Sequence, residues 1–288
     1  MAPRWLDEIA PATSPPFVRM GIRAMGETTP LFLDGDDVPA QLAEKDRILA
    51  AHHDDVVATT PEADAACAEL LTLIQSRPDR PDHSGPTPPP QDLDRLHPLE
   101  AAARLVAEDL CILQRDDRLG QWVLTAGAVC FPSHWRLRDK LGRPLADIHG
   151  PVPDYAQDLA DKVDRFFDRL RPGAGVWRRN WTVHTRPDLF APDPPAGPPD
   201  PPITVHNAGT RLWLRSEQQC LNLVAKTRAI LFTIRTQQVP LSTLREHPRL
   251  AAAIADAVDA WPEHQVAYRG GSAVTDPLVR YLRTISHS

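Results

Sequence analysis

The pattern of apolar and polar positions along this chain predicts helices first and then strands mixed with helices. Apolar residues three and four apart favour amphipathic helices, and Pro61, which follows two threonines, is typical of a first helical turn. Runs rich in β-branched and aromatic residues favour strands. The predicted helices span residues 38–51, 61–75, 97–110, 136–141, 153–170, 241–260 and 277–285. The predicted strands span residues 111–114, 121–131, 177–184, 212–214 and 229–236.

Two proline-rich segments interrupt this pattern, at about residues 77–92 and 187–202. The first segment offers nothing to a core, and both are predicted to be irregular loops. The predicted strands neighbour one another without regular βαβ alternation, which favours an α+β fold with an antiparallel sheet. We expect a single domain over residues 1–288, with the two loops as excursions from it.

Composition and charge narrow the class of protein. The chain has 288 residues and is 42% hydrophobic, enough for a substantial core. A net charge of −6 does not suit a surface that binds nucleic acid or an acidic membrane. There is no apolar signal core and no run of about 18 apolar residues, so we expect a cytoplasmic protein. The four cysteines are far apart and without a C-x-x-C motif, which predicts buried free thiols.

The most informative segment is Val123–Tyr155, where a strand pattern runs into F-P-S-H-W and then into His149. Pro151 and Pro153 restrict the backbone that carries this histidine. An imidazole whose direction is fixed in advance suits a metal or haem ligand. A histidine that caps a turn is the alternative.

Other functional signatures are absent from the sequence. It contains no phosphate-binding loop, no usable Rossmann fingerprint and no H-E-x-x-H zinc helix. The run of residues 52–55, His-His-Asp-Asp, resembles a metal cluster, but adjacent residues on a helix diverge, and a solvated helix end is the better interpretation. The sequence also lacks a flavin or nicotinamide fingerprint, so it is not expected to take electrons from NADPH itself. If the protein reduces dioxygen, it needs a separate reductase.

Several motifs in order resemble the haem-dependent oxidative N-demethylase family, over about residues 20–260. The residues that carry the resemblance are L-T-A-G at 124–127 through Trp135, K-L-G-R-P-L at 140–145 to His149, P-V-P at 151–153 with Tyr155, R-N-W at 179–181, L-R-S-E at 214–217 and I-L-F-T-I-R-T at 230–236.

The resemblance implies a PAS-like curved antiparallel sheet whose helices enclose a haem b. It implies a monooxygenase that uses dioxygen to remove a methyl group from a small amine, with release of formaldehyde. Electrons would come from NADPH through a separate flavin and iron–sulfur reductase. The chain departs from the family after Glu217: where the family tends to have Arg-Gln-Thr, it has Gln218-Gln219-Cys220. The cationic side chain beside Glu217 is therefore missing, so the resemblance does not define the exact substrate.

The resemblance favours His149 as the axial ligand of the haem iron. The rivals are Cys130, which a small buried thiol in a strand also explains, and, more weakly, His184 and His134. Glu217 is the candidate catalytic residue, to hold a protonated amine or relay protons to dioxygen; an ion pair is its alternative.

The remaining candidates would hold or surround the porphyrin. A guanidinium matches a haem propionate in a bidentate way, so Arg235, Arg215 and Arg143 are candidate clamps, with surface ion pairs as the alternative. Trp135, Trp181 and Tyr155 are candidate pocket walls, or plain core residues. A PAS-like haem sensor, a biosynthetic haem oxygenase with another nitrogen-containing substrate, and a haem-free relative remain alternative functions.

Overall fold

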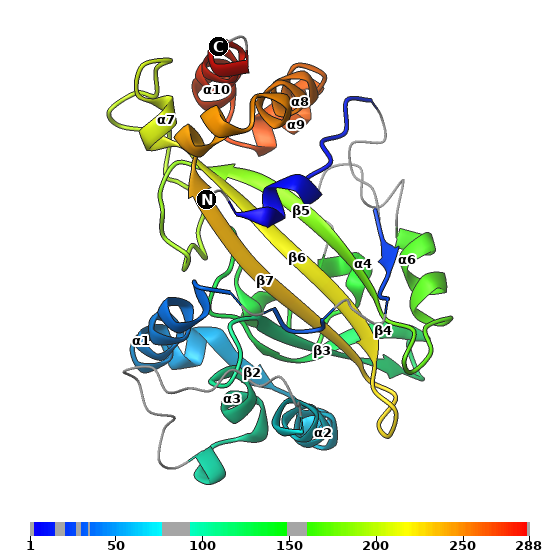
Figure 1. Ribbon diagram of the computed structural model, residues 1–288. Coiled ribbons are helices and arrows are strands. Elements are labelled where there is room, and N and C mark those ends of the chain that lie inside the picture. The colour runs from blue at the N-terminus through cyan, green and yellow to red at the C-terminus, as the bar shows by residue number, and fades with distance from the viewer. Residues whose placement is uncertain are drawn as a thin grey trace.

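The computed structural model describes residues 3–14, 21–26, 30–33, 35–76, 93–148 and 160–286. A seven-stranded antiparallel sheet crosses the molecule in the order β1-β5-β6-β7-β3-β4-β2 (Figure 1). The strands are β1 (Arg23–Ala24), β2 (Val57–Thr59), β3 (Asp109–Asp116), β4 (Gln121–Ala128), β5 (Val176–His184), β6 (Trp213–Leu223) and β7 (Ile230–Pro240).

Helices lie around both ends of this sheet (Figure 1). The α-helices are α1 (Val38–Val56), α2 (Asp64–Gln75), α3 (Pro98–Ala103), α4 (Leu145–Ile148), α6 (Ala160–Phe167), α7 (Ala208–Arg211), α8 (Pro248–Asp259), α9 (Glu263–Tyr268) and α10 (Ser272–Ser286). The 3-10 helices are η1 (Arg4–Glu8), η2 (Pro61–Ala63), η3 (Leu93–Arg95), η4 (Leu137–Asp139) and η5 (Leu241–Glu246). No helix in the described part of the chain has the length and apolar character needed to span a bilayer.

The long hairpin of β6 and β7 defines the two faces of the sheet. Successive side chains on a strand point to opposite faces, and Gln218 of β6 pairs with Arg235 of β7. We call the face that carries these two residues face A. The neighbouring residues of β6, Arg215 and Glu217, therefore lie on the opposite face, face B.

Face A is covered by two separate apolar clusters. At one end, η5, α8 and α10 pack on Leu214 and Val239, together with residues of η1. At the other end, α2 and α3 pack on Ile112 and Leu231. In Figure 1, η1 crosses in front of the sheet and the C-terminal helices stand above it, whereas α2 and α3 lie below. The strip of face A between the two clusters is polar.

Among the described residues, face B carries one apolar cluster. Its apolar cluster joins Cys111 and Leu113 of β3 to α4 and α6, and includes Leu137 of η4. The side chain of Leu137 approaches Gly127 so closely that a Cβ atom there would lie 2.6 Å from its Cδ1 atom. Towards β5 and β6, face B carries half-buried polar residues instead. The described part of face B is therefore apolar at one end and polar towards β5 and β6.

The α+β class and the antiparallel sheet predicted from the sequence are confirmed. The helix predicted over 97–110 is too long, because α3 ends at Ala103 and β3 already begins at Asp109. The strand predicted over 212–214 is too short, since β6 continues to Leu223. Of the helix predicted over 153–170, α6 accounts for the part from Ala160 to Phe167, and the part before residue 160 lies outside the described residues.

Candidate functional site

The carboxylate of Glu217 is held on face B by three polar side chains from two strands. Asn180, its cross-strand neighbour on β5, donates from Nδ2 to Oε2 at 3.3 Å. Gln219 donates from Nε2 to the same oxygen at 2.9 Å. Arg215 brings its Nε atom to 3.7 Å from Oε1. These contacts fix the direction of a carboxylate whose side chain remains 14% exposed and so can reach a ligand.

Arg215 is wholly buried and joins three segments of the chain. Its Nη1 atom donates to the carbonyl oxygen of Leu189 at 3.1 Å, and Nη2 donates to that of Phe131. Its Nε atom has no hydrogen-bond partner in the described residues. Burial lowers the pKa of Arg215, and Glu217 and Asp109 counteract this. The structure places Arg215 beside Glu217, as a link between β6 and two loops.

An apolar patch adjoins this polar group on face B. Leu221 and Phe232 are a cross-strand pair of half-buried side chains, and Trp135 packs against the same cluster. The ammonium group of Lys140 lies 5.0 Å from the centre of the Trp135 ring, a cation–π contact. It also donates to the carbonyl oxygen of Ile148 at 3.0 Å. We call Trp135, Lys140, Leu221 and Phe232 the face-B patch.

Two predicted site residues, His149 and Tyr155, lie outside the described residues. Ile148, which precedes His149 in the chain, is buried in the cluster on face B. The assignment of His149 as an axial ligand stays a prediction.

Two other histidines stack against each other at the end of β5. The rings of His134 and His184 are 4.9 Å apart and nearly parallel, at 15°. The Nε2 atom of His184 lies 3.0 Å from the hydroxyl oxygen of Ser133. Burial lowers the pKa of His184 to about 3, helped by Arg215 and His134, and partial burial together with Arg215 lowers the pKa of the more exposed His134 as well. Both imidazoles are therefore neutral at physiological pH, and both line a cavity of about 330 Å³.

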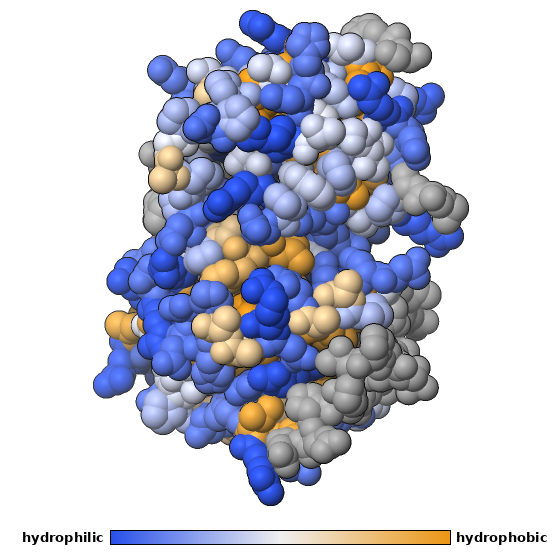
Figure 2. Space-filling view, turned by 90° about the vertical axis from the view of Figure 1, so that its left-hand side faces the viewer, coloured by the Kyte–Doolittle hydropathy of each residue, from blue (hydrophilic) through white to orange (hydrophobic). Residues whose placement is uncertain are grey.

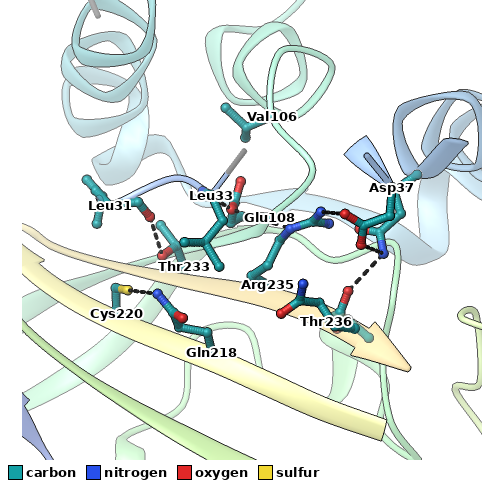
Figure 3. Close-up of polar contacts among 12 residues, drawn as sticks. Leu31, Leu33, Asp37, Val106, Glu108, Gln218, Cys220, Thr233, Arg235 and Thr236 are labelled. Carbon is teal, nitrogen blue, oxygen red and sulfur yellow. Dashed lines mark hydrogen bonds and ion pairs between the residues drawn. The ribbon is translucent and has the colours of Figure 1, made fainter. Parts of the chain in front are cut away.

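The structure places Arg235 on face A, on the opposite side of the sheet from Glu217. Figure 3 shows Arg235 between Glu108 and Asp37. Its Nη2 atom donates to Oδ1 of Asp37 at 2.8 Å, and its Nε atom lies 3.9 Å from Oε1 of Glu108. Burial raises the pKa of Glu108, opposed by Arg235. Arg235 therefore belongs to a buried polar group that holds the chain before α1 on the sheet.

Gln218, where the resembled family tends to carry arginine, lies between two arginines on face A. It pairs with Arg179 of β5 on one side and with Arg235 of β7 on the other. The Nη2 atom of Arg179 donates to Oε1 of Gln218 at 2.8 Å, and its Nε atom donates to Glu8 at 2.6 Å. An arginine at position 218, which the resembled family tends to have, would therefore lie on face A, away from the carboxylate of Glu217.

The other candidates are placed apart from Glu217. Trp181 is on face A, where its ring stacks on Trp261 with centres 5.8 Å apart. Arg143 is exposed in the turn after Gly142, and its carbonyl oxygen accepts from the amide of Leu124 at 3.2 Å. Burial raises the pKa of the Cys130 thiol to about 12, which disfavours the thiolate that iron ligation needs.

No group of three metal-ligating side chains is found among the described residues, including residues 52–55 at the end of α1. Sequence reasoning missed Asn180 and Gln219 as partners of Glu217, although both fall within or beside the motifs that carried the resemblance. It also missed Asp109, which accepts from the amides of Cys130 and Phe131 at 2.8 and 2.9 Å. A charged residue directly before an apolar strand was the only signal for it.

One comparison with known proteins bears on this site. A protein-family model described as "Haem-dependent oxidative N-demethylase, alpha subunit-like" matches residues 82–279, more than half of the chain. The matched range includes strands β3 to β7 and both Glu217 and the face-B patch.

Proposed function

This chain belongs to the haem-dependent oxidative N-demethylase, alpha subunit-like family, and we propose that it is a haem-b-dependent monooxygenase. Its proposed reaction is the oxidative removal of a methyl group from a small amine or a related nitrogen-containing substrate, with release of formaldehyde. The family match is the observation that carries this proposal, because the matched range contains Glu217 and the face-B patch.

The residues on face B fit a haem in their chemistry. A porphyrin is flat and apolar with two carboxylates at one edge. The face-B patch offers half-buried Leu221, Phe232 and Trp135 as an apolar bed. Lys140 and Arg178, both on this side of the sheet, supply cations beside it. We propose His149 as the axial ligand, directly after a residue buried at this patch, and a cupped, PAS-like enclosure of the cofactor between the sheet and its helices.

The haem would supply the activation of dioxygen, and the chain's own residues would bind and orient the substrate. We propose Glu217 as the group that accepts a proton from, or holds, the substrate ammonium. Its carboxylate is positioned for this role by Asn180, Gln219 and Arg215, so little reorganisation is needed when the substrate binds. The Arg215 contacts to Phe131 and Leu189 keep these groups in place.

We also propose that electrons reach the haem from NADPH through a separate flavin and iron–sulfur reductase. The sequence has no nicotinamide or flavin fingerprint, and the family description as an alpha subunit supports a partner.

The first experiment is an absorption spectrum of the protein purified from iron-replete cells. A Soret band that shifts on addition of dithionite and carbon monoxide is expected. His149→Ala should lose haem or change this spectrum, whereas His206→Ala, at an exposed position, should not. A colourless protein would contradict the proposal, and an unchanged spectrum of His149→Ala would remove His149 as the ligand.

The second experiment measures formaldehyde from dimethylamine with a surrogate reductase. Glu217→Gln should keep the haem spectrum and lose about 10²-fold or more in turnover, the usual contribution of a positioned acid or base. Glu263→Gln, at an exposed glutamate, is the matched control. A normal haem spectrum without formaldehyde from any methylamine would instead favour a sensor.

A further inference from the structure

The cavity beside the stacked histidines has no role in the proposed reaction. It lies between the end of β5, His134, and the loop that follows β5, and its volume is about 330 Å³. This size falls within the range of small-molecule sites. Its lining includes His134, His184, Arg186, Asp188, Phe190 and Asp193. Figure 2 shows hydrophobic residues gathered near the middle of an otherwise largely hydrophilic face, the one at the left of Figure 1.

Aromatic rings from two stacked pairs contribute to the wall of this cavity. The first pair is His134 and His184. The second is Phe190, whose ring stacks on that of His52 with centres 4.6 Å apart. Stacking against such rings favours a flat ligand, because offset-stacked aromatic pairs are stabilised beyond the area that they bury.

The imidazoles also present unused hydrogen-bonding atoms. His184 is 5% exposed, and only its Nε2 atom has a partner, Ser133. Its Nδ1 atom and both ring nitrogens of His134 have no hydrogen-bond partner among the residues that the structure describes. A neutral imidazole carries one donor and one acceptor nitrogen. The cavity therefore offers at least one donor and one acceptor to a ligand.

The backbone at His134 adopts an unfavourable conformation that fixes the position of its ring. His134 has a φ of 59°, in the left-handed region that is uncommon for residues other than glycine. Its amide donates to the carbonyl oxygen of Ala191 at 2.7 Å, and the Ala191 amide donates to Pro132 at 3.2 Å. Strain of this kind persists only where the surrounding structure enforces it, and it is concentrated at ligand sites.

The charged groups around the cavity are balanced. On its rim, Asp188 lies 3.6 Å from Arg186, and Asp193 accepts from Arg136 at 3.0 Å. Below the histidines, the charge of Arg215 is opposed by Glu217. Since both lining aspartates lie near an arginine and both imidazoles are neutral, the lining favours a neutral ligand over a charged one.

We propose that this cavity binds a neutral planar nitrogen heterocycle, which stacks on the exposed imidazole of His134 and hydrogen-bonds to the free ring nitrogens. The stacked rings favour a flat ligand. The unpaired ring nitrogens favour a ligand with a polar edge, and the paired charges of the rim favour a ligand without charge. This binding does not require haem or electron transfer, so its test is independent of the proposed function.

Titration calorimetry on the full-length protein tests the proposal with two flat probes, uracil with one ring and hypoxanthine with two. Neither is a strong iron ligand, so a bound haem does not confuse the result. At least one should bind, and 5,6-dihydrouracil, which keeps the polar edge of uracil but is not flat, should bind about tenfold more weakly than uracil. This follows from the loss of stacking. Nuclear magnetic resonance should show the ring signals of His134 and His184 shifting during the titration.

Two variants place the binding at this cavity. His134→Asn keeps a residue that tolerates a left-handed backbone, and Phe190→Leu keeps an apolar wall without an aromatic ring. Each should weaken binding of the better probe about tenfold, whereas the exposed His206→Asn should leave it unchanged. Failure of both probes to bind, equal binding of dihydrouracil and uracil, or preferential binding of dimethylammonium would overturn the proposal.

Discussion

Arg215 donates a hydrogen bond from its Nη2 atom to the carbonyl oxygen of Phe131, which joins β6 to the segment that leaves β4. The same guanidinium donates to Leu189 in the loop after β5 and faces Glu217. One buried cation therefore holds the loops at the edge of the candidate site and orients its carboxylate.

Arg215→Met should destabilise the fold by about 3–5 kcal/mol, because it leaves the carbonyl oxygens of Phe131 and Leu189 and the carboxylate of Glu217 without their cation. Urea unfolding followed by circular dichroism measures this change. Arg186→Met, at a side chain that is 80% exposed, is the control and should stay within about 0.5 kcal/mol of the parent. Equal stability of the two variants would contradict the structural role of Arg215.

Gln218→Arg should also destabilise the protein, although it introduces the residue that the resembled family tends to have. The new guanidinium would lie between those of Arg179 and Arg235 on a buried strip of face A. Burying a third like charge without a new anion should cost about 2–4 kcal/mol. Gln121→Arg, at the half-exposed start of β4, is the control in the same unfolding assay. No difference between these variants would argue that position 218 does not face the two arginines.

Stability should fall as the solution is acidified below about pH 6.5, through His184. Burial holds its pKa at about 3 against an ordinary value of 6.5, so below pH 6.5 the unfolded chain binds a proton that the folded protein excludes. This loss amounts to at most about 1.4 kcal/mol for each pH unit. It ends near pH 3, where the folded form also takes up the proton.

Asp109 acts in the opposite direction over part of this range. Burial raises its pKa to about 6 from 3.8, so its contribution is present at low pH and is lost as the pH rises through about 6. The contribution of His184 is isolated by comparing the parent with His184→Gln at each pH. The stability difference between them should shrink from pH 6.5 to pH 4, whereas the difference for His206→Gln should not change. A constant difference for His184→Gln would show that its pKa is ordinary.

The sequence predicted the positions of β3, β4, β5 and β7 because their short runs of apolar and aromatic residues favour strands, although the strand predicted over 121–131 extends past the end of β4 at Ala128. It missed most of β6, whose residues 215–222 are largely polar. These polar residues are accommodated because β5 and β7 pair with β6 on both sides. Asn180 donates a hydrogen bond to Glu217, and Arg179 donates one to Gln218. Such cross-strand partners are not visible in one strand's own sequence.

The candidate site was predictable in its residue types but only partly in its arrangement. Glu217 and Arg215 share a face because they are two residues apart on one strand, which the sequence alone implies once β6 is known. The separation of Arg235 from them depends on the register between β6 and β7. That register is set by the hairpin as a whole, so the sequence could not place Arg235 on face A.

The contact between Gly127 and Leu137 gives a last prediction, on the packing beneath the face-B patch. A Cβ atom at Gly127 would lie 2.6 Å from Cδ1 of Leu137, while the backbone there is not in the left-handed region. Gly127→Ala should therefore destabilise by about 1–3 kcal/mol through overpacking alone. Leu137→Ala should cost about 2–5 kcal/mol through the cavity that it leaves.

The double variant should be more stable than the sum of the two losses predicts, by about 1–2 kcal/mol, because the shorter side chain at residue 137 gives the new methyl group room. Urea unfolding of the parent, both single variants and the double variant completes the cycle. The same comparison with Ala126, the buried neighbour on the opposite face of β4, offers a control: Ala126→Gly combined with Leu137→Ala should be additive, since the two side chains lie on different sides of the sheet. Additivity in the Gly127 cycle as well would mean that η4 does not pack on β4 as described, and the position of Trp135 and Lys140 over face B would lose its support.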